Sequence, residues 1–93
     1  MYMDRRAKII VKGNVQGVFY RDHTKEKAKE LELKGYVKNE PNGTVKIVVE
    51  GKKEHIDKLV EWCHEGSPLA KVEDVSVELS PPMYEFEVFK SVR

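Results

Sequence analysis

Cysteine is scarce in this sequence: Cys63 is the single one among 93 residues. A lone cysteine excludes a scaffold held by internal disulfides and a zinc site built from several thiolates. Cys63 falls on the apolar side of a predicted helix, so we expect a small core residue. The acids near His23, His55 and His64 are scattered along the chain and predict no metal site with them, and we interpret these histidines as surface residues.

Long apolar runs are also missing, so no segment is expected to span a membrane. The first residues carry the charges of Asp4, Arg5 and Arg6 with no apolar stretch behind them, which predicts no signal peptide. We therefore expect a soluble, cytoplasmic protein. An excess of one charge is absent as well, because 17 basic residues face 16 acidic ones for a net charge of +1. That balance argues against a general nucleic-acid-binding protein, which is usually strongly basic.

The length and composition fit one domain, which we place at residues 1–93, with a 40% hydrophobic share that suffices for one two-layer core. Charged residues are abundant at 35%, against about 25% in typical soluble proteins. Lysine and glutamate dominate that excess, a composition found in heat-adapted proteins. We take a thermophilic source as a hypothesis that a melting temperature would test.

The hydrophobic periodicity predicts seven elements. A helix over 20–34 carries an inward stripe of Tyr20, Thr24, Ala28 and Leu31, with Gly35 as its left-handed terminating residue. A second helix over 53–65 buries Ile56, Leu59, Val60 and Cys63. Strands are predicted at 6–12, 36–40, 44–50, 72–79 and 84–88, with an Asn42-Gly43 turn between the second and third. This order predicts an α+β, ferredoxin-like sandwich: an antiparallel βαββαβ sheet with two helices on one face, plus a short C-terminal strand.

The stretch from Gly13 to Arg21 joins the first strand to the first helix. Its glycines permit a tight turn, and the first N–H groups of a helix lack intrahelical partners and lie at the positive end of its dipole. Val18, Phe19 and Tyr20 cannot cap those donors with side-chain oxygens, which leaves them free for a phosphate or carboxylate. Arg21 would add a charged fork matched to phosphate oxygens. The alternative is a plain connection with Arg21 as a surface charge.

Asn39 lies near the end of the second strand. A helical crossover makes the first two strands parallel, so their carboxyl ends meet at one edge of the sheet, about 10 Å apart with the third strand between them. An amide there can face an anion in the loop and hold a water by donating and accepting at once. The alternative is an asparagine that bonds local backbone before a turn.

Two runs carry a family resemblance. Residues Gly13 to Arg21, GNVQGVFYR, resemble the first signature of the acylphosphatases, and residues Gly35 to Val45, GYVKNEPNGTV, resemble the second. Gly51 also falls where the second signature expects a glycine. Tyr20 departs from the pattern, because the family more often has Phe; we expect this exchange of one ring for another to leave the site intact.

The resemblance implies hydrolysis of an acyl phosphate to a carboxylate and inorganic phosphate, with no metal and no cofactor. It implies that Arg21 and the backbone N–H groups of Val15, Gln16, Gly17, Val18, Phe19 and Tyr20 hold the phosphate. It implies that Asn39 orients the attacking water. The expected partner is a small acyl phosphate, with no nucleic acid and no membrane; a monomer is the default.

Two other functions fit the same fold. An RNA-binding module would present aromatic residues on its central strands, but the first and third strands, around Ile9 and Ile47, contain none. A catalytically silent domain that binds a small anion in the loop is not excluded by the sequence.

Overall fold

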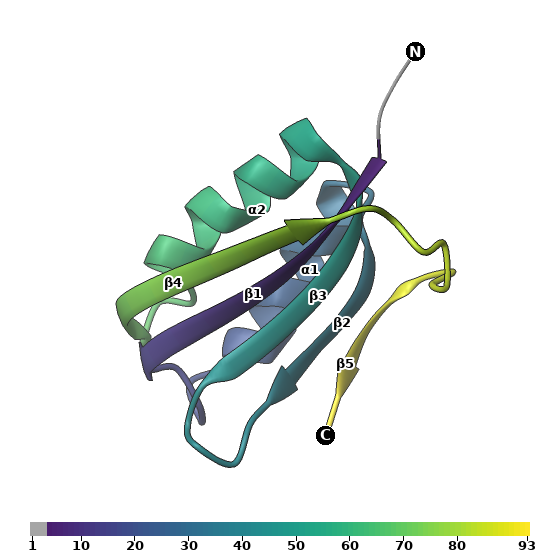
Figure 1. Ribbon diagram of the computed structural model, residues 1–93. Coiled ribbons are helices and arrows are strands. Elements are labelled where there is room, and N and C mark those ends of the chain that lie inside the picture. Colours follow the sequence, from purple (N-terminus) through teal and green to yellow (C-terminus); the bar gives the residue numbers. More distant parts are fainter. Residues whose placement is uncertain (1–3) are drawn as a thin grey trace.

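The computed structural model describes residues 4–93 as one sheet with two helices packed on a single face (Figure 1). The elements are β1 (Asp4–Asn14), α1 (Tyr20–Glu30), β2 (Lys34–Asn39), β3 (Val45–Lys52), α2 (Lys53–Glu65), β4 (Lys71–Ser80) and β5 (Phe89–Val92). The strands lie in the order β4-β1-β3-β2-β5. Strand β1 pairs antiparallel with both β3 and β4, and β2 pairs antiparallel with β3. The predicted ferredoxin-like α+β class is therefore confirmed, and so is the parallel relation of β1 and β2 on either side of β3.

Alternate residues of the central strands form the core between the sheet and the helices. Ala7, Ile9 and Val11 of β1 pair in register with Val49, Ile47 and Val45 of β3, and all six are fully buried. Helix α2 covers them with a buried row made by Ile56, Leu59 and Cys63. This helix has the predicted bounds. The four strands predicted for the βαββαβ unit agree with β1, β2, β3 and β4 to within two residues at each end.

Helix α1 is shorter than predicted: it ends at Glu30 instead of Lys34. The left-handed residue is Glu32, with φ 56°, and not Gly35. The N–H groups of Leu33 and Glu32 bond back to the carbonyls of Ala28 and Lys29, which is the Schellman pattern that stops a helix. Leu33 is buried, so its packing fixes the end of the helix in place of a glycine.

Gly35 has a different function from the one predicted. It lies within β2 at φ 143°, where any Cβ would collide with the carbonyl oxygen of Val48 on the neighbouring strand. A glycine is thus required for close strand approach, which a sequence cannot distinguish from a helix terminator. Gly51 lies inside β3, which ends at Lys52.

The C-terminal strand exists, but its predicted position over 84–88 is wrong. Strand β5 begins at Phe89, which is buried, and it pairs parallel with β2, so the full five-stranded sheet is mixed. The segment before β5 is bound to β3 instead, because the Glu50 carboxylate accepts hydrogen bonds from the N–H groups of Met83 and Tyr84 at 2.8 and 2.9 Å. Within residues 4–93 no helix is both long and apolar enough to cross a membrane.

Candidate active site

The loop between β1 and α1 leads into a helix whose first turn has no side-chain cap. Phe19 occupies the N-cap position in the left-handed region, at φ 61° and ψ 23°. Gly17 also has a positive φ, 74°, with open space where a Cβ would stand, so the backbone conformation rather than crowding favours glycine. The predicted lack of a capping side chain is confirmed.

The loop is fixed by the side chain of Gln16 and by the carbonyl of Val18. The Gln16 amide nitrogen donates to the carbonyls of Glu40 and Thr44, at 2.8 and 2.9 Å, in the turn between β2 and β3. The Ser67 hydroxyl donates to the Val18 carbonyl at 2.8 Å. These bonds use none of the loop's N–H groups. The backbone N–H groups from Val15 to Tyr20 donate to no acceptor within residues 4–93. The sequence had suggested only a backbone role for Gln16, and its side-chain contacts were missed.

Arg21 lies in the first turn of α1 and is half-buried. One terminal nitrogen of its guanidinium, Nη1, donates to the carbonyl oxygen of Val92 at 2.8 Å. The C-terminal strand therefore fixes an arginine located 71 residues earlier in the chain. A backbone acceptor carries no sequence signal, and this contact could not have been predicted from residue types. It leaves the other N–H donors of the fork available.

Asn39 is the last residue of β2, and it pairs in register with the buried Val45 of β3. That register puts its side chain on the face of the sheet that the helices cover. Its Oδ1 atom is buried and has no hydrogen-bond partner within residues 4–93. A buried acceptor without a donor costs about 1–3 kcal/mol, so such an atom marks a position where a donor belongs.

These elements enclose a hollow of about 280 Å³, lined by Val15, Gly17, Phe19, Tyr20, Arg21, Asp22 and Asn39. The structure thus brings both predicted side chains, Arg21 and Asn39, to the uncapped loop. Asp22 also lines the hollow, although the sequence predicts no role for it there. None of the three histidines lines this hollow, and within residues 4–93 no three His, Cys, Asp or Glu side chains gather as metal ligands.

Tyr20 contributes its backbone to the loop and its side chain to the core. The ring is almost fully buried at 1% exposure, and its hydroxyl donates to the Cys63 carbonyl at 2.8 Å. Burial, reinforced by the neighbouring Cys63 side chain, raises the pKa of the Tyr20 phenol far above its usual range, so the hydroxyl stays protonated. The tyrosine therefore has an internal partner for the one polar atom that a phenylalanine lacks.

Comparison with known proteins identifies the family. The acylphosphatase family model matches residues 7–91. The chain belongs to the acylphosphatase family. An acylphosphatase of Rubrobacter xylanophilus is 51% identical over 77 residues, which cover 83% of this chain and 70% of that protein. An acylphosphatase of Marinobacter nauticus is 45% identical over 86 residues, covering 92% and 94%.

Solved structures agree with the sequence relatives. The crystal structure of acylphosphatase from Bacillus subtilis superposes with a TM-score of 0.92 at 37% identity, covering 96% of this chain and 99% of that one. The predicted activity, hydrolysis of the carboxyl–phosphate bond of an acyl phosphate, is thereby confirmed at the level of the acylphosphatase family. The hollow between α1 and β2 is the candidate for its active site.

Proposed function

We propose that the phosphoryl group of the acyl phosphate binds in the 280 Å³ hollow, held by the backbone N–H groups of Val15 to Tyr20 and by the Arg21 guanidinium. The observation that carries this proposal is the set of N–H groups without internal acceptors, located where the helix dipole favours an anion. The carbonyl bonds from Gln16 and Ser67 fix the loop, so the donors are organised before a substrate arrives.

Hydrolysis of an acyl phosphate requires few catalytic groups besides this phosphate-binding site. The leaving group is a carboxylate whose conjugate acid has a pKa of about 4, so it departs without being protonated and needs no general acid. Phosphoryl transfer through a loose transition state depends mainly on positioning and on stabilising charge on the phosphoryl oxygens. A ring of backbone donors and one guanidinium provides that stabilisation without any rearrangement during the reaction.

Arg21 stabilises the charge on the phosphoryl group from a fixed position. The bond from Nη1 to Val92 uses one donor of the guanidinium and restricts its rotation. The remaining donors of the planar fork match two phosphate oxygens.

Asn39 orients the nucleophilic water. Its side chain lines the hollow, where an amide can donate to and accept from one water at once. When the water is held in line with the departing carboxylate, the entropy cost of bringing the reactants together is already met, and the barrier is lower. An amide is a poor base, so a phosphoryl oxygen is the acceptor for the water's proton.

The test is release of inorganic phosphate from a simple aryl acyl phosphate, measured with a chelator present. We expect turnover that the chelator does not change and a pH–rate profile without an essential base near neutrality. Phosphate binding without turnover would instead favour a catalytically silent anion-binding domain, and loss of activity with chelator would contradict the metal-free reaction.

We also propose that residues 1–93 form one domain that acts as a monomer in the cytoplasm. The Cα radius of gyration, 12.1 Å, is close to the value of about 12 Å for a compact domain of this length. Light scattering coupled to gel filtration should give the chain mass of 10.8 kDa; a dimer mass would contradict the monomer.

A further inference from the structure

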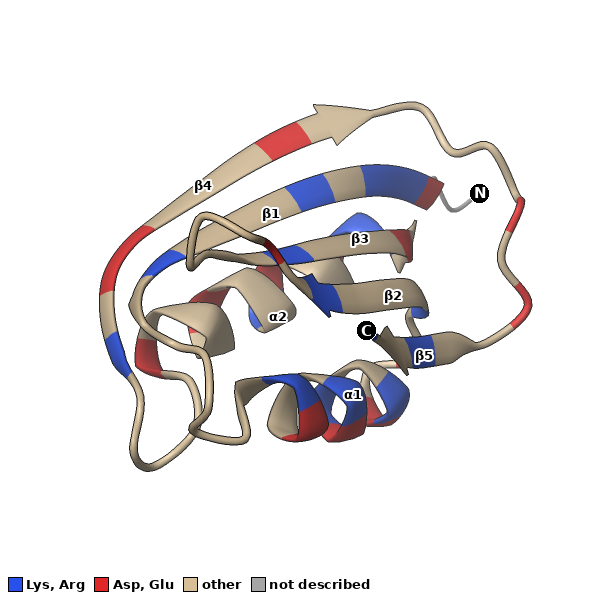
Figure 2. Cartoon of the chain, turned by 90° about the horizontal axis from the view of Figure 1, so that it is seen from below, with Lys and Arg blue, Asp and Glu red and all other residues tan. Residues whose placement is uncertain are grey.

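The face of the sheet opposite the helices carries lysines at neighbouring positions. Figure 2 shows basic segments side by side on β1, β3 and β2. Lys38 of β2 pairs in register with Lys46 of β3, and neither forms an ion pair within residues 4–93. Like charges directly opposite each other on one face destabilise a sheet. Two adjacent positive charges without an ion-pair partner among residues 4–93 favour an anion on this face.

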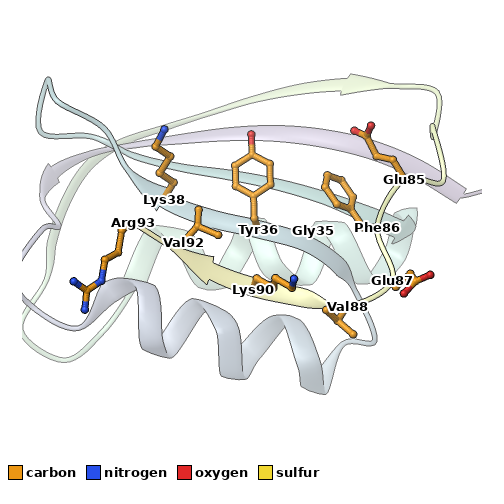
Figure 3. Close-up of a pocket in the computed structure, with 10 residues that line it drawn as sticks. All are labelled: Gly35, Tyr36, Lys38, Glu85, Phe86, Glu87, Val88, Lys90, Val92 and Arg93. Carbon is orange, nitrogen blue, oxygen red and sulfur yellow. The ribbon is translucent and has the colours of Figure 1, made fainter.

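An aromatic corner lies beside these lysines. Tyr36 is two residues before Lys38 on β2, and its ring centroid is 5.9 Å from that of Phe86 with the rings inclined at 69°. The Arg6 guanidinium lies over the Phe86 ring, 5.2 Å from its centroid, and holds it in place. Figure 3 shows Tyr36 and Lys38 projecting together from β2, with Phe86 beside Tyr36.

Tyr36, Lys38 and Phe86 line a hollow of about 620 Å³ that shares no lining residue with the proposed phosphoryl site. Lys90 of β5, the register partner of Tyr36, and Arg93 add further cations to its lining. Within residues 4–93, neither acid of the lining forms an ion pair with Lys38 or Lys90. Glu85 is paired with Arg6, and Figure 3 places Glu87 at the opposite end of the hollow from Lys38.

We propose that this hollow binds a single nucleoside phosphate, with its base against the Tyr36 ring and its phosphate near Lys38 and Lys90, the lysines that line it. Aromatic side chains stack on bases at the open faces of sheets, and lysine ammonium groups act as point charges for phosphate. One aromatic corner offers room for one base, and the net charge of +1 does not favour a polyanion. Strands β1 and β3 contribute no aromatic residue to this corner, which combines Tyr36 of β2 with Phe86, 50 positions later in the chain.

The experiment is an amide NMR titration of the whole chain with adenosine 5′-monophosphate, and in parallel with inorganic phosphate and with adenosine. We expect saturable shifts at Tyr36, Lys38 and Lys90 with the monophosphate that neither component alone reproduces. Tyr36→Leu should weaken binding by at least about fivefold, because a stacked base contributes about 1–3 kcal/mol. Tyr36→Phe keeps the ring and should bind as the parent does.

Lys90→Gln, a change at an exposed residue, tests the phosphate end without risk to the fold and should weaken binding about two- to fivefold. Lys29→Gln on α1 is the matched control and should change nothing. The proposal is overturned if shifts are confined to residues 15–20, if inorganic phosphate alone reproduces the response at Tyr36, or if Tyr36→Leu binds as the parent does. It is equally overturned if a single-stranded oligoadenylate binds more than about tenfold tighter than the monophosphate.

Discussion

The proposed reaction needs the positive charge of Arg21. The fold depends little on this side chain, because it forms few hydrogen bonds with the rest of the protein. The side chain is half-buried and its single described bond is to the Val92 carbonyl. We predict that Arg21→Ala abolishes phosphate binding and lowers kcat/KM by at least about 1,000-fold, the range for loss of an arginine that stabilises a transferring phosphoryl group. Phosphate binding by calorimetry and turnover of an aryl acyl phosphate are the measurements. Arg21→Lys keeps the charge without the fork and should retain weak binding; unchanged turnover in Arg21→Ala would contradict the assignment.

Asn39 should behave in a different way, because its proposed contact is with water and not with phosphate. We predict that Asn39→Ala lowers kcat by about 100- to 1,000-fold, as loss of one positioned active-site donor does, while the Kd for phosphate changes little. Its Oδ1 has no partner within residues 4–93, so urea unfolding should show no large loss of stability. If phosphate binding and stability fall together with turnover, Asn39 is a structural residue.

At the scale of the element, helix α1 ends in a conformation that its sequence does not favour. Glu32 is left-handed at φ 56°, where a Cβ is unfavourable by about 1–2 kcal/mol. We predict that Glu32→Gly stabilises the protein by about 0.5–1 kcal/mol in urea unfolding, net of the entropy that a glycine adds to the unfolded chain. Glu30→Gly, within the last helical turn, is the matched control and should destabilise by about 1 kcal/mol. Equal effects of the two changes would mean that the helix end is misplaced.

Strand β5 should act on catalysis through Arg21. A chain that ends at Ser91 loses the Val92 carbonyl that holds the guanidinium, while the buried Phe89 and most of the pairing with β2 remain. We predict that this truncation lowers kcat/KM by at least about tenfold, because a misplaced catalytic group costs rate even when the fold persists. Arg93→Ala, which keeps Val92, is the control and should retain most of the activity. A truncated chain with full activity would show that Arg21 needs no help from β5.

For the whole molecule, Glu50 connects the open face of the sheet to the segment before β5. Burial works to raise the pKa of its carboxyl, but the N–H groups of Met83 and Tyr84 and the Arg6 guanidinium outweigh it and hold that pKa below its usual range. A lowered folded pKa contributes stability above the unfolded value of about 4.3 and loses it as the pH falls through the folded value. Glu50→Gln should therefore cost about 1–3 kcal/mol at pH 7 and much less near pH 3.

Urea unfolding of both proteins at the two pH values measures this difference. Glu61→Gln, at an exposed position of α2, is the control and should track the parent at both. A gap between Glu50→Gln and the parent that stays constant from pH 7 to pH 3 would show that ionisation of Glu50 does not stabilise the fold.

Local patterns determined most of this protein. Alternation fixed which face of β1 and β3 is buried, helical spacing fixed the bounds of α2, and the absence of a capping residue before Arg21 indicated an anion site. These features depend on residues near one another in the chain, so the hydrophobic effect and backbone sterics act on them before any tertiary contact forms. Crossover handedness then placed Asn39 at the same edge of the sheet as the loop.

Only the tertiary structure decided the rest. Whether Gly35 stops a helix or permits close strand approach depends on the Val48 carbonyl, and where the last strand begins depends on Glu50 holding the segment before it. The Val92 carbonyl that holds Arg21 and the corner between Tyr36 and Phe86 also join residues 50 or more positions apart. Such contacts use backbone atoms, which every residue has, or pairings whose partners are chosen only once the sheet is assembled.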